Sequence, residues 1–158
     1  MEKDLESIEE VYNELCKKYK LPKFKDIDNE FEISCFEKGK FLTRNILRTI
    51  EEKLELGILV LGSIVHPDGA TLSSMYEVRF FTDDEKNDMY HLFKKMMKAN
   101  REIGELLLGN DEREQAEFVN NFFQEWIVIK KKLKGFIGKM KESWGKDTGI
   151  EEDIGYLG

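Results

Sequence analysis

The sequence predicts an all-α protein: an antiparallel bundle of about four helices, three of them long and the N-terminal one shorter. Apolar residues recur at three- and four-residue steps over most of the chain, and only two prolines interrupt its 158 residues. A chain of this length can bury about two thirds of its extended surface, which is enough for one core. We therefore predict a single helical domain over residues 1–146 and a short, disordered, flexible acidic tail over residues 147–158.

The first helix is predicted over residues 2–20, and Pro22 ends it because the residue before a proline avoids the helical region. Its apolar stripe consists of Leu5, Ile8, Val11, Tyr12, Leu15 and Cys16. Residues 23–33 are predicted to be a connector with a short helical turn. We expect its apolar side chains to pack back onto the body; they are Phe24, Ile27, Phe31 and Ile33.

The second helix is predicted from about Cys35 to Val65, because Ser34 and Glu37 match a capping box and residues 66–69 (HPDG) form a stop. Its apolar seam consists of Leu47, Ile50, Leu54, Ile58, Leu61 and Val65. Residues 70–81 alternate poorly, which predicts an ordered loop or a short helical turn.

A second capping box, Thr82 with Glu85, predicts the start of a third helix that ends before Gly109. Asn110 or Asp111 then starts a fourth helix, which Gly145 closes. The fourth helix has the strongest periodic pattern of the chain: Val119, Phe122, Trp126, Ile129, Leu133, Phe136, Met140 and Trp144. A seam of this heptad-like kind packs at the shallow angle of helical bundles.

The net charge of −7 disfavours a protein that mainly coats nucleic acid or an anionic membrane. The charged N-terminus is unlike a signal peptide, and no apolar run approaches the about 20 residues that span a bilayer. These observations predict a cytoplasmic protein without a membrane. A composition rich in Glu and Lys and poor in Gln favours an archaeal or thermophilic source.

No motif in the sequence indicates a catalytic residue, a metal site or a cofactor. Cys16 and Cys35 lack zinc spacing, and we expect both to be buried, reduced thiols. Asp88 and His91 have the spacing of a di-iron motif, but no second such histidine follows. Several glutamates could in principle converge on magnesium, although their alternation with lysine is typical of an exposed face: Glu51, Glu52, Glu55, Glu102 and Glu105.

A lysine-rich stretch near the end of the fourth helix is a candidate polyanion surface: Lys130, Lys131, Lys132, Lys134, Lys139 and Lys141. The alternative is that these cations only complement the negative end of the helix dipole. The stretch contains no arginine, which disfavours base-edge readout. The acidic residues 147–158 could fold over these lysines and mask them.

The apolar segment before the third helix is a candidate interaction surface, formed by Met75, Tyr76, Arg79, Phe80 and Phe81. Met, Tyr and Phe dominate the hot spots of interfaces. The alternative is that the segment packs over the end of the bundle.

The leading functional hypothesis from the sequence is a non-catalytic helical module for protein–protein interaction or assembly, whose partner is another protein or a second copy. The alternative is a nucleic-acid- or ribosome-associated factor that uses the lysine stretch. A third and weaker hypothesis is a divalent-metal-dependent phosphohydrolase.

Overall fold

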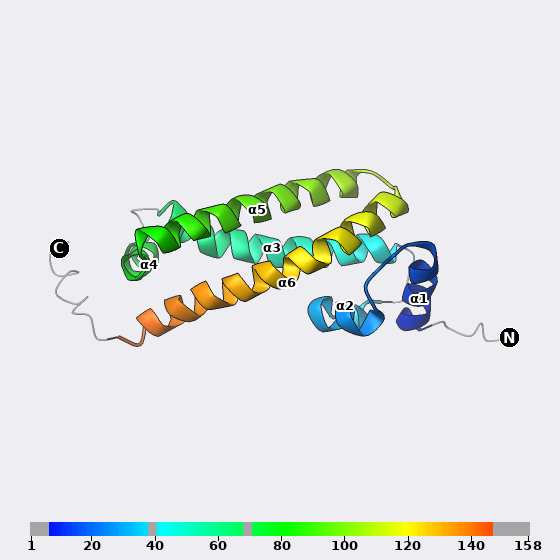
Figure 1. Ribbon diagram of the computed structural model, residues 1–158, viewed down its shortest axis with the longest axis horizontal. Coiled ribbons are helices and arrows are strands. Elements are labelled where there is room, and N and C mark those ends of the chain that lie inside the picture. Colours follow the sequence, from blue (N-terminus) through cyan, green and yellow to red (C-terminus); the bar gives the residue numbers. More distant parts are fainter. Residues whose placement is uncertain (1–6, 38–40, 68–70, 147–158) are drawn as a thin grey trace.

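A computed structural model describes residues 7–37, 41–67 and 71–146, and its body is a bundle of three long helices (Figure 1). These are α3 (Leu42–Val65), α5 (Asp83–Leu108) and α6 (Glu112–Ser143). A tight turn joins α5 to α6, and the two helices separate from that turn toward the other end, while α3 packs along both. Thus α5 runs antiparallel to both α3 and α6.

Shorter helices cover the two ends of the bundle. α1 (Ile8–Lys18), α2 (Phe24–Phe31) and the 3₁₀ turn η1 (Ile33–Cys35) lie at one end, and α4 (Leu72–Glu77) with the 3₁₀ turn η2 (Val78–Phe80) lies at the other (Figure 1). The described residues therefore contain six α-helices and no strand. The predicted all-α class is confirmed, but the predicted number of about four helices is wrong.

The largest error concerns the start of the second long helix, which begins at Leu42 and not at Cys35. The backbone N–H of Ser34 donates to Asp28 Oδ1 (2.7 Å), and residues 33–35 form a 3₁₀ turn. Glu32 adopts the left-handed conformation (φ 52°), which turns the chain after α2. Ile33 is buried in the core, so this turn packs with α2 and does not join the following helix.

The N-terminal region is also more helical than predicted. α1 begins after Ser7, which forms a capping box with Glu10. The predicted first helix extended over residues 2–20, and residues 2–6 of it lie outside the described part. The predicted connector is α2, because Ile27 and Phe31 share one apolar face. All four of its predicted packing residues contact the core: Phe24, Ile27, Phe31 and Ile33.

The remaining predicted boundaries agree with the structure. Thr82 and Glu85 form the predicted capping box of α5, and Asp111 caps α6 by accepting the N–H groups of Arg113 and Glu114. Residues 70–81 had two predicted forms, and the helical one is found in α4 and η2. The predicted tail, residues 147–158, lies outside the described residues.

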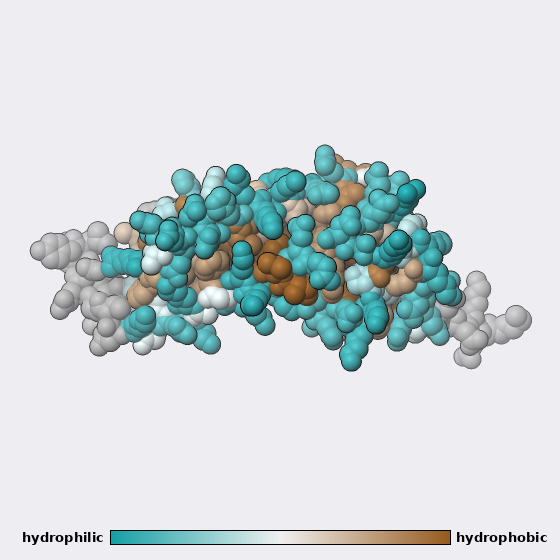
Figure 2. Space-filling model, in the orientation of Figure 1, coloured by the Kyte–Doolittle hydropathy of each residue, from teal (hydrophilic) through white to brown (hydrophobic). Residues whose placement is uncertain are grey.

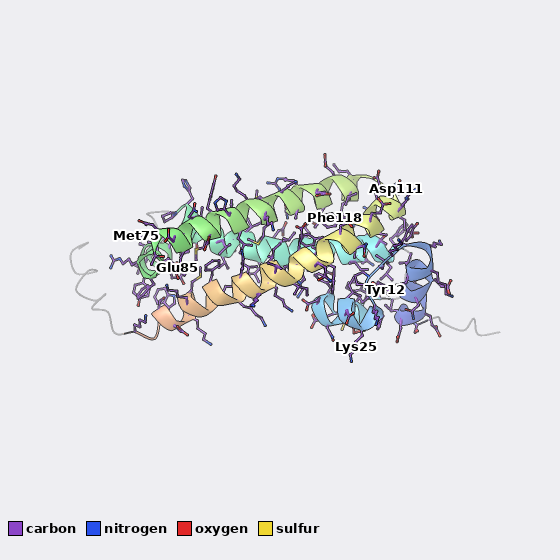
Figure 3. All side chains as sticks on the ribbon, in the orientation of Figure 1. Tyr12, Lys25, Met75, Glu85, Asp111 and Phe118 are labelled. Atoms are coloured by element: carbon purple, nitrogen blue, oxygen red, sulfur yellow. The ribbon has the colours of Figure 1, made fainter. Side chains whose placement is uncertain are left out.

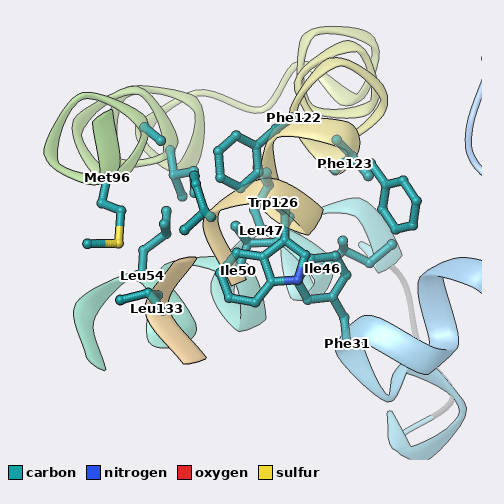
Figure 4. Close-up of a cluster of buried hydrophobic side chains, with 14 of the residues drawn as sticks. Phe31, Ile46, Leu47, Ile50, Leu54, Met96, Phe122, Phe123, Trp126 and Leu133 are labelled. Atoms are coloured by element: carbon teal, nitrogen blue, oxygen red, sulfur yellow. The ribbon is translucent and has the colours of Figure 1, made fainter. Parts of the chain in front are cut away.

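The core runs continuously through the three long helices and under α1 and α2. Figure 4 shows its central part, where Trp126 of α6 lies beside Phe31 of α2 with ring centroids 5.7 Å apart. The three helices approach closely at Gly57 of α3, which faces Met96 of α5 and Leu133 of α6. A side chain at this position would meet both neighbours.

Arg44 of α3 holds the turn between α5 and α6. Its Nη1 donates to the carbonyl of Gly109 (2.7 Å) and to Asn110 Oδ1 (3.1 Å). Its Nη2 donates to the carbonyl of Leu107 (2.8 Å). The guanidinium thus satisfies carbonyl groups that the end of α5 leaves without helical partners.

Candidate functional site

The predicted interaction surface at α4 and η2 divides into a buried part and an exposed part. Tyr76 is buried, its hydroxyl donates to the Ser143 carbonyl (2.6 Å), and its ring lies 4.4 Å from that of Trp144. Phe81 is also buried, against Phe136 and the Lys139 ammonium group. These contacts attach the segment to the C-terminal end of α6.

Two residues of the same predicted surface stay accessible, and one is half-buried. Met75 and Arg79 are exposed, whereas Phe80 lies 5.0 Å from the Tyr76 ring. Met75 lies at the opposite end of the bundle from Tyr12 (Figure 3). Sequence reasoning named both alternatives for this segment, and the structure assigns Tyr76 and Phe81 to packing over the bundle end.

Two of the predicted polyanion residues form ion pairs within the chain. Lys130 Nζ donates to both oxygens of Glu30 on α2 (2.6 and 2.7 Å), and Trp126 Nε1 donates to the same carboxylate (2.9 Å). Burial acts to raise the pKa of the Glu30 carboxyl, but the hydrogen bonds from Lys130 and Trp126 outweigh it and hold this pKa below its ordinary value. Lys130 therefore fastens α2 to α6.

Lys139 has a similar role near the other end of α6. Its ammonium group donates to both oxygens of Glu85 (2.7 and 2.8 Å), the residue that completes the capping box of α5. The hydrogen bond from Lys139 and the N–H of Thr82 together lower the pKa of the Glu85 carboxyl. This ion pair spans α5 and α6 where the two helices have separated.

The other four predicted lysines point into solvent. Lys131, Lys132, Lys134 and Lys141 are exposed, and over the described ranges no carboxylate lies within ion-pair distance of them. Of the lysine stretch, these four are therefore the residues that could contact an anionic partner. The predicted masking by residues 147–158 concerns a segment outside the described part.

A groove of about 500 Å³ lies between α5 and α6 on the side away from α3. Its floor contains Phe118 and Phe122, whose rings stack 5.2 Å apart, with Ala99 and Leu106. Its rim is mixed in charge: Lys95, Lys98, Glu102, Glu114, Glu117 and Glu125. Because Phe118 and Phe122 are already buried, the groove offers a partner little apolar area.

A second cleft of about 430 Å³ lies between the end of α1 and the first turns of α6. Its cations are Lys18, Lys20 and Arg113. Arg113 pairs with Glu117 (3.0 Å), and Lys18 lies 4.0 Å from Glu112. These acids neutralise much of the positive charge, so the cleft is a weak anion site.

Sequence reasoning missed exposed aliphatic side chains on two helices, α3 and α6. On α3, Leu56 and Leu59 are 61% and 73% exposed, and on α6, Ile127 and Val128 are 37% and 51% exposed. A brown patch lies near the centre of Figure 2, over the middle of α6 in Figure 1. The signal was in the sequence, because these residues fall outside the predicted apolar seams of their helices.

The described residues contain no group of three or more His, Cys, Asp or Glu side chains that could hold a metal ion. Asp88 and His91 are both exposed on α5. Cys16 is half-buried and Cys35 is exposed, and both thiols are free. The prediction that both cysteines are buried is therefore wrong for Cys35, which is the last residue of the 3₁₀ turn η1. Among the described helices, none is long and apolar enough to cross a membrane.

Comparison with protein-family models, with curated proteins and with solved structures found no match.

Proposed function

We propose that this chain is a non-catalytic helical module for protein–protein interaction or assembly. The observation that carries the proposal is the set of uncovered aliphatic side chains on the outer faces of α3 and α6, at Leu56, Leu59, Ile127 and Val128. Exposed apolar side chains that lie close together mark interaction sites more often than isolated ones do, and these residues form one pair on α3 and one pair on α6. The cytoplasmic location and the archaeal or thermophilic source are part of this proposal.

The packed core supports the same proposal. Large apolar side chains of α3 and α6 such as Leu54, Leu61 and Trp126 are buried, so the bundle has a full core without Leu59 or Val128. Aliphatic residues at these outer positions therefore do little for the fold. Contact with another protein would bury these exposed aliphatic side chains.

The test is affinity purification of the tagged chain from its native cells, with variants that add a charge to an aliphatic position. We expect Val128→Glu to lose a partner that binds α6, and Leu59→Glu to lose a partner that binds α3. Asn87→Glu is the matched control, because it adds the same charge at an exposed position of α5 away from the aliphatic residues. Circular dichroism checks that each variant folds. A strict monomer that retains no protein in any such experiment contradicts the proposal.

The second candidate function is association with nucleic acid or with the ribosome. It is favoured by the four exposed lysines that lack an intrachain ion pair in the described part: Lys131, Lys132, Lys134 and Lys141. We expect RNA binding that weakens with salt and that is lost when these four residues become Glu. Lys130 is left unchanged, because its replacement would break the contact with Glu30. No binding at low salt contradicts this candidate.

A further inference from the structure

Two exposed aliphatic side chains of α6, Ile127 and Val128, lie at the midpoint of the helix, and a third, Ile137, lies farther toward its C-terminal end. α6 extends over Glu112–Ser143, so its midpoint falls between Ile127 and Val128. Farther toward the C-terminal end of α6, the backbone at Gly135 and Gly138 is not covered by neighbouring atoms, since an added Cβ at either position would meet no atom within 4 Å. Another helix could therefore approach this half of α6 closely.

The charges of α6 are divided at the same midpoint. Residues 112–129 contain four Glu and one Arg, which gives −3, and residues 130–143 contain six Lys and one Glu, which gives +5. A second α6 that ran in the same direction would place like charges together. An antiparallel second α6 would place the acidic half of each helix against the basic half of the other.

A two-fold axis at the midpoint of α6 determines which residues of the two copies lie opposite each other. Opposed residues then have numbers that sum to about 255, so Val128 lies at the axis and Arg113 lies opposite Glu142 of the second copy. Glu125 and Lys132 share one side of the helix, because they are seven residues apart. Their numbers sum to 257, so Glu125 of one copy would lie within about 3 Å, measured along the helix axis, of Lys132 of the other. Neither residue has an ion pair within the described ranges.

We propose that α6 pairs with α6 of a second copy of this chain, in an antiparallel two-fold contact centred on Val128. This inference rests on the proposed function and names the partner of its α6 part, the exposed Ile127 and Val128. A two-fold contact uses the same patch on both copies, as the commonest oligomers do. Each copy then covers the Ile127 and Val128 side chains of the other.

The small size of the contact places it in the class of weak, transient interfaces. A helix of 32 residues is about 48 Å long at about 1.5 Å per residue, and a face about 10 Å wide covers about 480 Å². Standard interfaces bury about 800 Å² on each partner. We therefore expect a reversible dimer, with a Kd of about 10–100 µM.

Sedimentation equilibrium of the full chain up to about 500 µM, several times the expected Kd, tests the proposal. We expect a concentration-dependent dimer that Val128→Glu abolishes. Leu59→Glu is the matched control, since it adds the same charge to a more exposed aliphatic residue on α3, and it should leave the Kd unchanged. A chain that is monomeric throughout this range overturns the proposal, and so does an equal effect of the two variants.

A charge exchange tests the register. Lys132→Glu should weaken the dimer at least tenfold, and Glu125→Lys in the same chain should restore it. Within one chain the two positions lie about 10.5 Å apart along α6, too far for a direct ion pair, so restoration must come from the second copy. Failure to restore the dimer overturns the antiparallel register.

The sedimentation result also separates this inference from the proposed function. If the chain is monomeric but still retains a partner protein that Val128→Glu removes, the dimer is overturned and the proposed function stands. If the chain is monomeric and retains no protein, both are overturned.

Discussion

Replacement of Gly57 by Ala should destabilise the protein, although the same replacement at an open helical position should stabilise it. Alanine gains about 1 kcal/mol over glycine in a helix interior, because glycine loses more backbone freedom on folding. Gly104 of α5 is the matched control, since an added Cβ there would meet no atom within 4 Å. For Gly104→Ala we therefore expect a gain of about 1 kcal/mol.

At Gly57 the new methyl group has no room. Its carbon would lie 2.8 Å from Met96 Sδ and 2.9 Å from Leu133 Cδ1, whereas relaxed contacts between such atoms are about 3.5–4.0 Å. Both neighbours must retreat by about 1 Å, and overpacking of this kind typically costs about 1–3 kcal/mol. After subtraction of the helical gain of about 1 kcal/mol, the net change at Gly57 is a loss of about 1 kcal/mol.

Urea unfolding followed by circular dichroism measures both free energies of unfolding. The reasoning is refuted if Gly57→Ala is as stable as Gly104→Ala. A double-mutant cycle identifies the neighbour involved. Leu133→Ala should cost less in the Gly57→Ala background than in the natural sequence, because the added methyl group fills part of the cavity. Equal costs in the two backgrounds would mean that Leu133 does not oppose the methyl group.

Three other predictions concern the contacts that hold the shorter helices and the α5–α6 turn. Tyr76→Phe removes the buried hydrogen bond to the Ser143 carbonyl and should lower the free energy of urea unfolding by about 1 kcal/mol; an unchanged value would contradict a role for this bond. Arg44→Met removes three donors at the α5–α6 turn and should cost about 1–2 kcal/mol in the same assay, and equal stability would count against the predicted role. Because the pKa of Glu30 is lowered in the folded state, its stabilising effect is complete above the unfolded value of about 4.3 and is lost as the pH falls through the folded value. The melting temperature of Glu30→Gln should thus be below that of the natural chain at pH 7 and approach it at acid pH, and a constant difference would contradict the assignment.

The three long helices could be predicted from the sequence because each has a continuous apolar stripe between recognisable ends. The start of α3 could not be predicted in this way. Ser34 and Glu37 match the sequence pattern of a capping box, but tertiary contacts determine the conformation of the chain at these residues. Burial of Ile33 and the hydrogen bond from the Ser34 N–H to Asp28 keep that turn with α2. The local sequence pattern alone cannot show whether the Ser34 N–H group belongs to a new helix or donates to Asp28.

The sequence could not show how the residues of the candidate surfaces divide into members with and without an ion pair in the described part of the chain. Lys130 and Lys139 look like their lysine neighbours in the sequence. Only their partners distinguish them, and Glu30 and Glu85 lie 100 and 54 positions away along the chain. The exposed Val128 was missed because an aliphatic residue beside a predicted seam is easily assigned to the core.

The two tryptophans of this chain each donate their indole N–H to a glutamate of a different short helix. Trp126 donates to Glu30 of α2, and Trp144 donates to Glu77 of α4 (2.7 Å). Each indole is therefore an intrinsic fluorescent reporter of whether one short helix is packed on the bundle. A chain with Trp126 alone reports the release of the N-terminal helices, and a chain with Trp144 alone reports the release of α4, so the order in which the two ends detach can be observed without an added label.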